Sequence, residues 1–104
     1  MKKDNFENNN ERFIRSGPQW VESATGFVVQ SAGRYKIEYV EGDHVLVVPI
    51  EDIGDPFKVI LYLSEAQKWQ PPYDTEPISP DRLREIHSNI MEALKFLKTP
   101  FEIK

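Results

Sequence analysis

The sequence predicts an α+β domain, in which an antiparallel β-meander of four to five strands is followed by one long C-terminal amphipathic helix packed on one face of the sheet. Between residues 20 and 63, short β-branched and aromatic runs alternate with glycine-containing turns, a pattern typical of strands. Residues 83–97 carry leucine and isoleucine at helical three- and four-residue steps. The chain of 104 residues is long enough to bury one hydrophobic core.

The N-terminal residues predict a tail that precedes the domain. Residues 1–12 are polar, include three consecutive asparagines and show no hydrophobic periodicity, so we expect a disordered tail followed by a single domain over residues 13–104. The two lysines near the start are not followed by an apolar run, which argues against a secretory signal. The longest apolar stretch, residues 45–50, is far below the roughly 20 residues of a membrane helix. We therefore expect a cytoplasmic protein without membrane contact.

The strand predictions follow the chain from Trp20. A second run begins at Phe27, and the clearest hairpin comes next. Apolar and charged residues alternate over residues 34–39, which indicates a half-buried strand. The pair Gly42-Asp43 suits a two-residue hairpin turn. The return strand over residues 44–49 is apolar almost throughout, which predicts a central strand covered on both faces.

The next segment combines a strand with a long connection. Residues 57–63 alternate again and predict another strand, whereas residues 64–78 form a connection that is long for a compact domain. Long loops are usually functional or packed by their own side chains. Trp69 and Tyr73 in this loop fit two interpretations, a plug against the open end of the sheet or a surface for binding a protein.

The predicted helix runs from about Pro80 to Lys98. Ser79 is a favourable N-cap, proline fits the first helical position, and Asp81 lies where the helix dipole favours an acid. Thr99-Pro100 ends the helix, and residues 101–104 can form a last short strand. The predicted apolar stripe consists of Leu83, Ile86, Ile90, Leu94 and Leu97.

The sequence contains no pattern that indicates catalysis, a metal or a cofactor. Cysteine is absent, which excludes disulfides, thiolate metal sites and a cysteine nucleophile. His44 and His87 lack metal-ligand spacing, and the five glycines are dispersed instead of forming a phosphate loop. The acids of residues 51–55 lack the order of a calcium loop. We therefore predict no catalytic residue, no cofactor and no bound metal.

The negative charge is concentrated in the middle of the chain. The net charge is −4, but residues 38–76 hold nine acids against two lysines, a balance of −7. Nucleic-acid binding needs a basic footprint, so this distribution argues against it. An acidic segment suits a basic protein partner, although it also fits a solvated surface without a target. The candidate partner-binding residues are Glu41, Asp43, Glu51, Asp52, Asp55, Tyr73, Asp74 and Glu76.

Three features together resemble one group of proteins. Trp20 lies in the first predicted strand, the run W-x-P-P-Y-D-x-E-x-I spans residues 69–78, and R-x-x-H-x-N-I-x-x-A-L-x-F-L spans residues 84–97. Over residues 18–104 the chain resembles small bacterial immunity proteins of polymorphic-toxin and contact-dependent growth inhibition systems. The resemblance implies a cytoplasmic antitoxin that binds a toxin domain, in many cases a basic nuclease, and covers its active site without catalysis. It assigns no binding residue.

Two other functions remain open at this stage. The chain could be a small enzyme or ligand-binding module that uses a pocket between loop 64–78 and the sheet. It could also be a structural subunit of a larger assembly. The sequence leaves its oligomeric state open as well. An antitoxin should bind one cognate partner, a ligand-binding module should gain thermal stability with a small molecule, and a structural subunit should not be soluble and monomeric alone.

Overall fold

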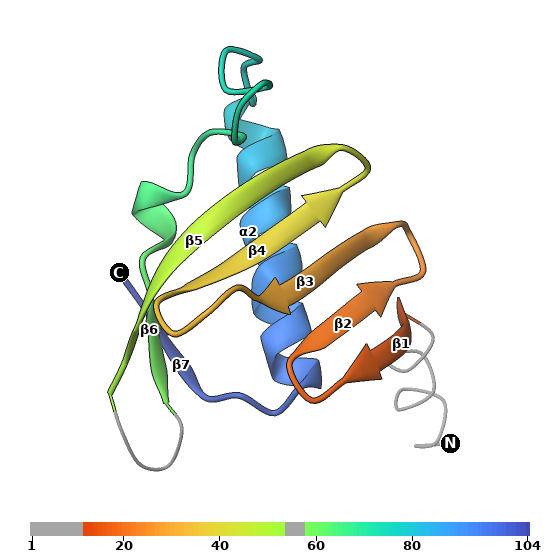
Figure 1. Cartoon of the computed structure of the whole chain (residues 1–104), viewed down its shortest axis with the longest axis vertical. Helices are drawn as coiled ribbons and strands as arrows, with labels where there is room; N and C mark the ends of the chain where they lie inside the picture. The colour runs from red at the N-terminus through yellow and green to blue at the C-terminus, as the bar shows by residue number, and fades with distance from the viewer. Residues whose placement is uncertain (1–11, 54–57) are drawn as a thin grey trace.

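The computed structural model describes residues 12–53 and 58–104, which form one sheet and one long helix (Figure 1). The strands follow one another across the sheet in sequence order. Their bounds are β1 Phe13–Gly17, β2 Trp20–Ser23, β3 Phe27–Ser31, β4 Lys36–Glu41, β5 His44–Asp52, β6 Val59–Leu61 and β7 Phe101–Ile103, with a short 3₁₀ helix, η1, at Leu63–Glu65 and the long helix, α2, at Pro80–Phe96.

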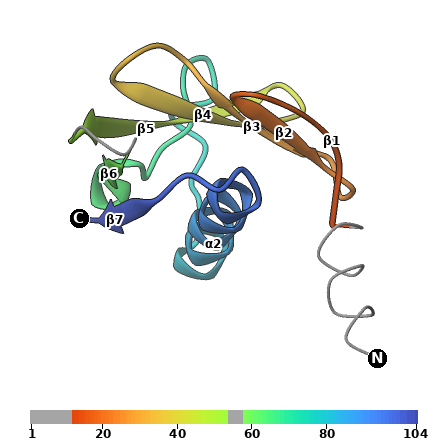
Figure 2. The same ribbon diagram turned by 90° about the horizontal axis from the view of Figure 1, so that it is seen from below.

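The sheet and α2 form two layers, and the sheet curls so that β6 and β7 come to lie beside the helix (Figure 2). This arrangement confirms the predicted α+β class with one C-terminal helix. The described residues form seven strands, however, more than the four to five predicted. The strand β1 escaped prediction because only Phe13 is buried in it, so the sequence shows no alternation there.

The last strand also corrects the expectation of a purely antiparallel sheet. Strands β1 to β6 pair antiparallel, but β6 and β7 pair parallel, with Val59 opposite Phe101. The segment between β6 and β7 contains α2, and a long crossover of this kind returns the chain in the same direction. The helix therefore forms both the second layer and the connection between two neighbouring strands.

Two strand predictions change in detail. The strand predicted over residues 57–63 is shorter, since β6 covers only Val59–Leu61 and η1 follows; residue 57 lies outside the described residues. In β5, Leu46 and Val48 are completely buried, whereas Val45 and Val47 on the opposite face are partly exposed. The prediction that both faces of this strand are covered is therefore wrong, because α2 packs on one face only (Figure 2).

The predicted two-residue turn between β4 and β5 is confirmed. Gly42 has a φ of 61°, a backbone conformation that glycine adopts without steric cost. The turn places Glu41 opposite His44 in the ladder. Both residues therefore lie at the same end of the sheet, next to the turn.

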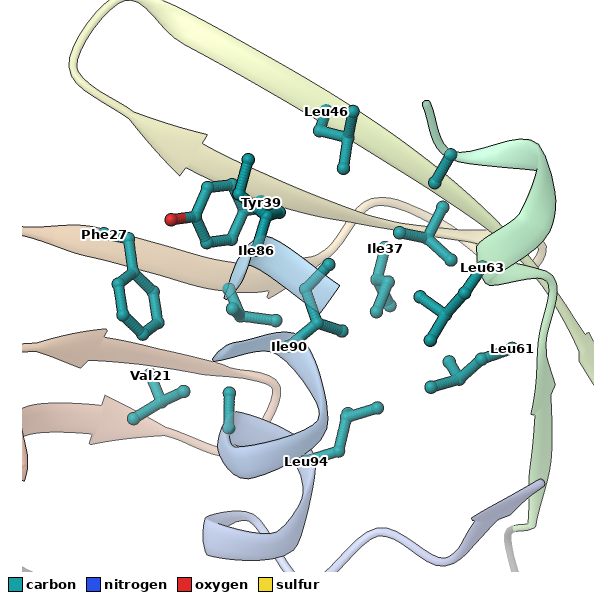
Figure 3. Close-up of a cluster of buried hydrophobic side chains, with 14 of the residues drawn as sticks. Val21, Phe27, Ile37, Tyr39, Leu46, Leu61, Leu63, Ile86, Ile90 and Leu94 are labelled. Atoms are coloured by element: carbon teal, nitrogen blue, oxygen red, sulfur yellow. The ribbon is translucent and has the colours of Figure 1, made fainter. Parts of the chain in front are cut away.

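The core lies between the sheet and α2 (Figure 3). Ile86, Ile90 and Leu94 supply its helical side and are at most 5% exposed, which confirms the centre of the predicted stripe, while Leu83 and Leu97 at its two ends are half-buried. The fully buried apolar and aromatic residues of the sheet are Val21, Val29, Tyr39, Leu46, Val48 and Leu61.

The helix begins as predicted and ends slightly earlier. The hydroxyl of Ser79 accepts a hydrogen bond from the backbone N–H of Arg82 at 3.2 Å, and Pro80 is the first helical residue. The C-cap is Leu97, after which Lys98 adopts a φ of 61° that turns the chain out of the helix. A contact of Arg82, in the first turn of α2, with Glu41 places the N-terminus of the helix beside the end of β4.

Candidate functional site

Five of the predicted partner-binding residues gather at one end of the molecule, where the turn between β4 and β5 meets loop 70–79 and the start of α2 (Figure 1). We call this region the hairpin–loop surface. It consists of Glu41, Asp43, His44, Tyr73, Asp74, Glu76 and Arg82.

His44 joins the loop to the hairpin. Its Nε2 atom lies 2.9 Å from Oε1 of Glu76, and its ring stacks on Tyr73 with centroids 3.9 Å apart and an interplanar angle of 18°. The edge of the His44 ring also meets Trp69 at 5.0 Å between centroids. One side chain of β5 thus contacts three residues of the long connection.

The position of Trp69 decides between the two interpretations of this residue that the sequence leaves open. It is 7% exposed and belongs to the core, where it forms an isolated β-bridge with Leu46. The long connection is therefore packed by its own side chain, as the plug interpretation expects. Tyr73 is half-buried.

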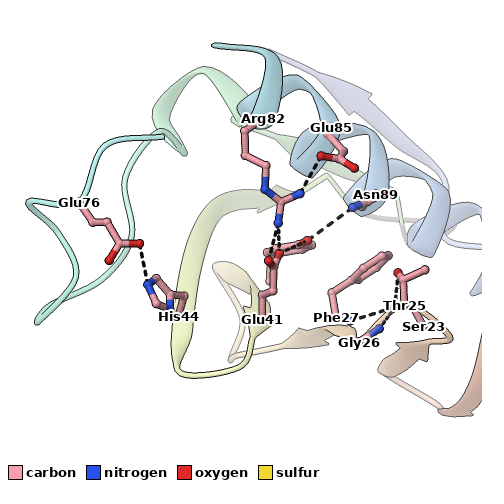
Figure 4. A network of polar contacts seen from close by, with 11 residues as sticks. Ser23, Thr25, Gly26, Phe27, Glu41, His44, Glu76, Arg82, Glu85 and Asn89 are labelled. Atoms are coloured by element: carbon pink, nitrogen blue, oxygen red, sulfur yellow. Dashed lines mark hydrogen bonds and ion pairs between the residues drawn. The ribbon is translucent and has the colours of Figure 1, made fainter. Parts of the chain in front are cut away.

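Glu41 is held from two sides (Figure 4). The guanidinium of Arg82, on α2, donates to both carboxylate oxygens of Glu41 and also to Oε1 of Glu85 at 2.8 Å. From the sheet, the hydroxyl of Tyr39 donates to Glu41 at 2.7 Å. Charge-assisted bonds such as those from Arg82 are the strong ones among side-chain hydrogen bonds.

The contacts around Glu41 shift two pKa values. Burial raises the pKa of Tyr39 to about 12, and the hydrogen bond to Glu41 adds to the rise, while a hydrogen bond from Asn89 acts against it. Burial alone would lower the pKa of Arg82, but its hydrogen bonds to Glu85 and Glu41 outweigh that effect and raise it. The phenol therefore stays neutral and the guanidinium charged at physiological pH.

A cleft of about 410 Å³ opens in this surface. It is lined by Glu41, His44, Trp69, Glu76, Pro77, Ile78, Ser79 and Arg82. The turn, the loop and the first residues of α2 together contribute six carboxylates (Glu41, Asp43, Asp74, Glu76, Asp81 and Glu85) and two arginines (Arg82 and Arg84). Four negative charges therefore remain uncompensated, and this end of the molecule attracts cations.

The other candidate residues lie elsewhere. Glu51 and Asp52 are the last two residues of the nine-residue strand β5, which begins at His44. Because a strand rises by roughly 3.3 Å per residue, Asp52 lies about 26 Å from His44. Glu51 there accepts a hydrogen bond from the hydroxyl of Tyr62 at 2.6 Å. Asp55 lies outside the described residues. The acidic middle of the sequence is thus divided between two ends of the sheet.

A second cleft, of about 430 Å³, lies at the C-terminal end of α2, where core residues such as Val29 and Leu94 form part of its lining together with Lys98. Within residues 12–53 and 58–104, no group of three or more histidine, aspartate or glutamate side chains is placed to hold a metal ion. In the same part of the chain, no helix has the length and apolar character needed to cross a membrane.

Sequence reasoning missed two residues of the surface. Neither His44 nor Arg82 is among the partner-binding residues predicted from the sequence. For His44, its place directly after a predicted two-residue turn puts it at the end of the hairpin, which is a usable signal. For Arg82, the partner Glu41 lies 41 residues away, and no local pattern reveals that pairing.

The fold and the hairpin–loop surface define a small α+β protein with an acidic end and a cleft in it. Comparison with family models matches residues 24–104 to the family described as Immunity protein 74. The chain therefore belongs to this family of small immunity proteins of toxin systems, which confirms the resemblance noted in the sequence. Comparisons with curated proteins and with solved structures find no match.

Proposed function

We propose that this protein neutralises one cognate bacterial toxin domain by binding it directly, without catalysis, in the cytoplasm. The observation that carries the proposal is its membership of an immunity-protein family. We further propose that the toxin binds at the hairpin–loop surface and that this surface covers the active site of the toxin.

Charge and shape support this choice of surface. The four uncompensated negative charges of the turn, the loop and the first residues of α2 would steer a basic domain, such as a nuclease, towards this end of the molecule. Tyr73 is a half-buried residue of a type that is enriched in protein interfaces. The loop and the hairpin are already fixed by His44, so little ordering is needed on binding.

Growth rescue tests the function. The C-terminal domain of the protein encoded immediately upstream is expressed with and without this chain. We expect growth arrest that disappears on co-expression, and a complex of the two proteins that survives purification. Growth arrest that persists although the chain is folded and abundant would remove that domain as the target.

A titration separates binding from catalysis. Purified toxin is mixed with increasing amounts of the chain, and the residual toxin activity is measured. A binding antitoxin has to be present in amounts comparable to the toxin, so the activity should fall linearly to an equivalence point. Complete neutralisation by a small fraction of an equivalent would instead indicate an enzyme that modifies the toxin.

A ligand-binding module is the second candidate function. The cleft of about 410 Å³ between the loop and the hairpin lies where the sequence suggested a pocket, and its size is in the range of small-molecule sites. A thermal-shift screen of metabolites checks this possibility, because a ligand that binds only the folded protein raises its melting temperature.

A further inference from the structure

Arg82 connects the helix layer to the end of the sheet. Its side chain is 32% exposed and donates to Glu41, in the last position of β4, and to Glu85, one turn further along α2. Within the part of the chain that the structure describes, residues 12–53 and 58–104, no other ion pair links the sheet to α2. The planar guanidinium joins two carboxylates in a fixed geometry, because its Nη2 atom contacts both oxygens of Glu41 while its Nη1 atom donates to Glu85.

Glu41 transmits this constraint to the hairpin. The carboxylate lies directly before the turn, and the ladder pairs Glu41 with His44, which in turn holds the loop through Glu76 and Tyr73. Figure 4 shows two of these side-chain contacts, Arg82 with Glu41 and His44 with Glu76, and the backbone pairing of Glu41 with His44 connects them from α2 through the hairpin to the loop. Fixing the first member of this chain restricts the positions of all the others.

We infer that Arg82 is a positioning residue for partner binding: by holding Glu41, it keeps the hairpin–loop surface in its binding shape before the toxin arrives. The inference rests on the proposed function and adds to it. A surface that is ordered in advance loses less conformational freedom on association, and this advantage is expressed mainly as slower dissociation.

Simple electrostatics predicts the opposite effect of removing Arg82. Arg82 is a cation in an acidic surface that faces a basic partner, so its loss would make the surface more negative and speed association. Positioning predicts weaker binding through faster dissociation. The sign of the change in affinity therefore separates the two roles.

The first test compares Arg82→Gln with Arg84→Gln by measuring association and dissociation rates of the toxin complex. Arg84 is the matched control, since it lies two residues away, is 72% exposed at its side chain and pairs with Asp81 on the same helix. Both variants remove one positive charge. We expect Arg82→Gln to dissociate about tenfold faster and to bind more weakly, with Arg84→Gln within about twofold of the wild type.

The second test asks whether Arg82 acts through Glu41. In a double-mutant cycle of Arg82→Gln and Glu41→Gln, the two effects on the dissociation rate should be strongly non-additive, because each change breaks the same contact. Arg82→Lys keeps the charge but lacks the two separate nitrogens that contact Glu41 and Glu85, so it should recover only part of the wild-type residence time. Melting temperatures of all variants confirm that each is folded at the temperature of the binding assay, and Arg82→Lys replaces Arg82→Gln if the latter does not fold.

Three results would overturn the inference. They are an Arg82→Gln complex as long-lived as the wild type, additive effects in the cycle, and equal losses for Arg82→Gln and Arg84→Gln. Failure of the wild-type protein to bind the toxin would refute the proposed function, and the inference with it. Wild-type binding combined with any of the three results refutes only the role of Arg82.

Discussion

The imidazole of His44 lies flat on the phenol ring of Tyr73, with ring centroids 3.9 Å apart, and so fastens a loop to a hairpin that is 29 residues away in sequence. The same imidazole approaches Glu76 at 2.9 Å. A residue in the first position of β5 thereby fixes the shape of a segment that has little regular secondary structure of its own.

His44→Ala should loosen the loop without unfolding the domain. The substitution removes the ring stack and the partner of Glu76, so the short-range hydrogen bonds of the loop lose their support. Hydrogen exchange at the amides of Gln70, Tyr73 and Glu76, which donate to backbone carbonyls, should become faster. Tyr35→Ala, at a side chain 66% exposed, serves as the control. Unchanged exchange rates in the His44 variant would contradict this role of the stack.

The helix stripe should dominate the stability of the fold. Ile90→Ala and Leu94→Ala each remove a large aliphatic side chain that is at most 5% exposed, and each should lower the free energy of unfolding by about 2–5 kcal/mol. Urea denaturation measures the change. Ile103→Ala, at a side chain 49% exposed, should cost much less. Wild-type unfolding curves for both core variants would refute the packing of α2 on the sheet.

The N-cap of α2 should make a separate, smaller contribution. Ser79→Ala removes the acceptor of the Arg82 backbone N–H and should cost about 0.5–2 kcal/mol. Ser88→Ala is the matched control, because Ser88 is an exposed residue inside the same helix, where alanine is the better helix former. Equal losses for the two serines in chemical denaturation would show that capping is not the cause.

Stability should fall in strongly alkaline solution because of Tyr39. Its pKa is raised from 10.0 to about 12 in the folded protein, so between these pH values the unfolded chain gives up the phenolic proton while the folded chain retains it. The contribution is complete below pH 10 and is lost as the pH rises towards 12, by about 3 kcal/mol at most. Other groups ionise in the same range, so the measured quantity is the difference between the wild type and Tyr39→Phe in urea unfolding at pH 8, 10 and 11. A pH-independent difference would contradict the shift.

The elements with strong local signals could be predicted from the sequence. The turn at Gly42, the N-cap at Ser79 and the buried stripe through Ile90 each depend on residues close together in the chain. The strand β1 could not be predicted in this way, because Phe13 alone faces the core and its partners are supplied by distant rings, Phe27 and Phe96.

The candidate site was predictable only in part. The charge distribution along the chain points to acids at the turn and in the loop, but it does not separate them from Glu51 and Asp52, which the length of β5 carries to the other end of the sheet. Sequence distance is a poor guide to spatial distance along a strand, because an extended segment separates its two ends as far as a chain can. The contact between Glu41 and Arg82 depends on how α2 lies across the sheet, which no local pattern encodes.

Charge reversal at the two ends of β5 decides which acids meet the toxin. Asp43→Lys with Asp74→Lys changes two exposed residues of the hairpin–loop surface, and Glu51→Lys with Asp52→Lys makes the same change in charge at the far end. Because the proposed partner is basic, the first pair should slow association strongly and weaken its dependence on salt. The second pair should have a small effect that high salt removes, since long-range attraction alone is altered. Stopped-flow association rates at two salt concentrations measure both. A larger loss for Glu51→Lys with Asp52→Lys in a folded protein would place the toxin at the other end of the sheet.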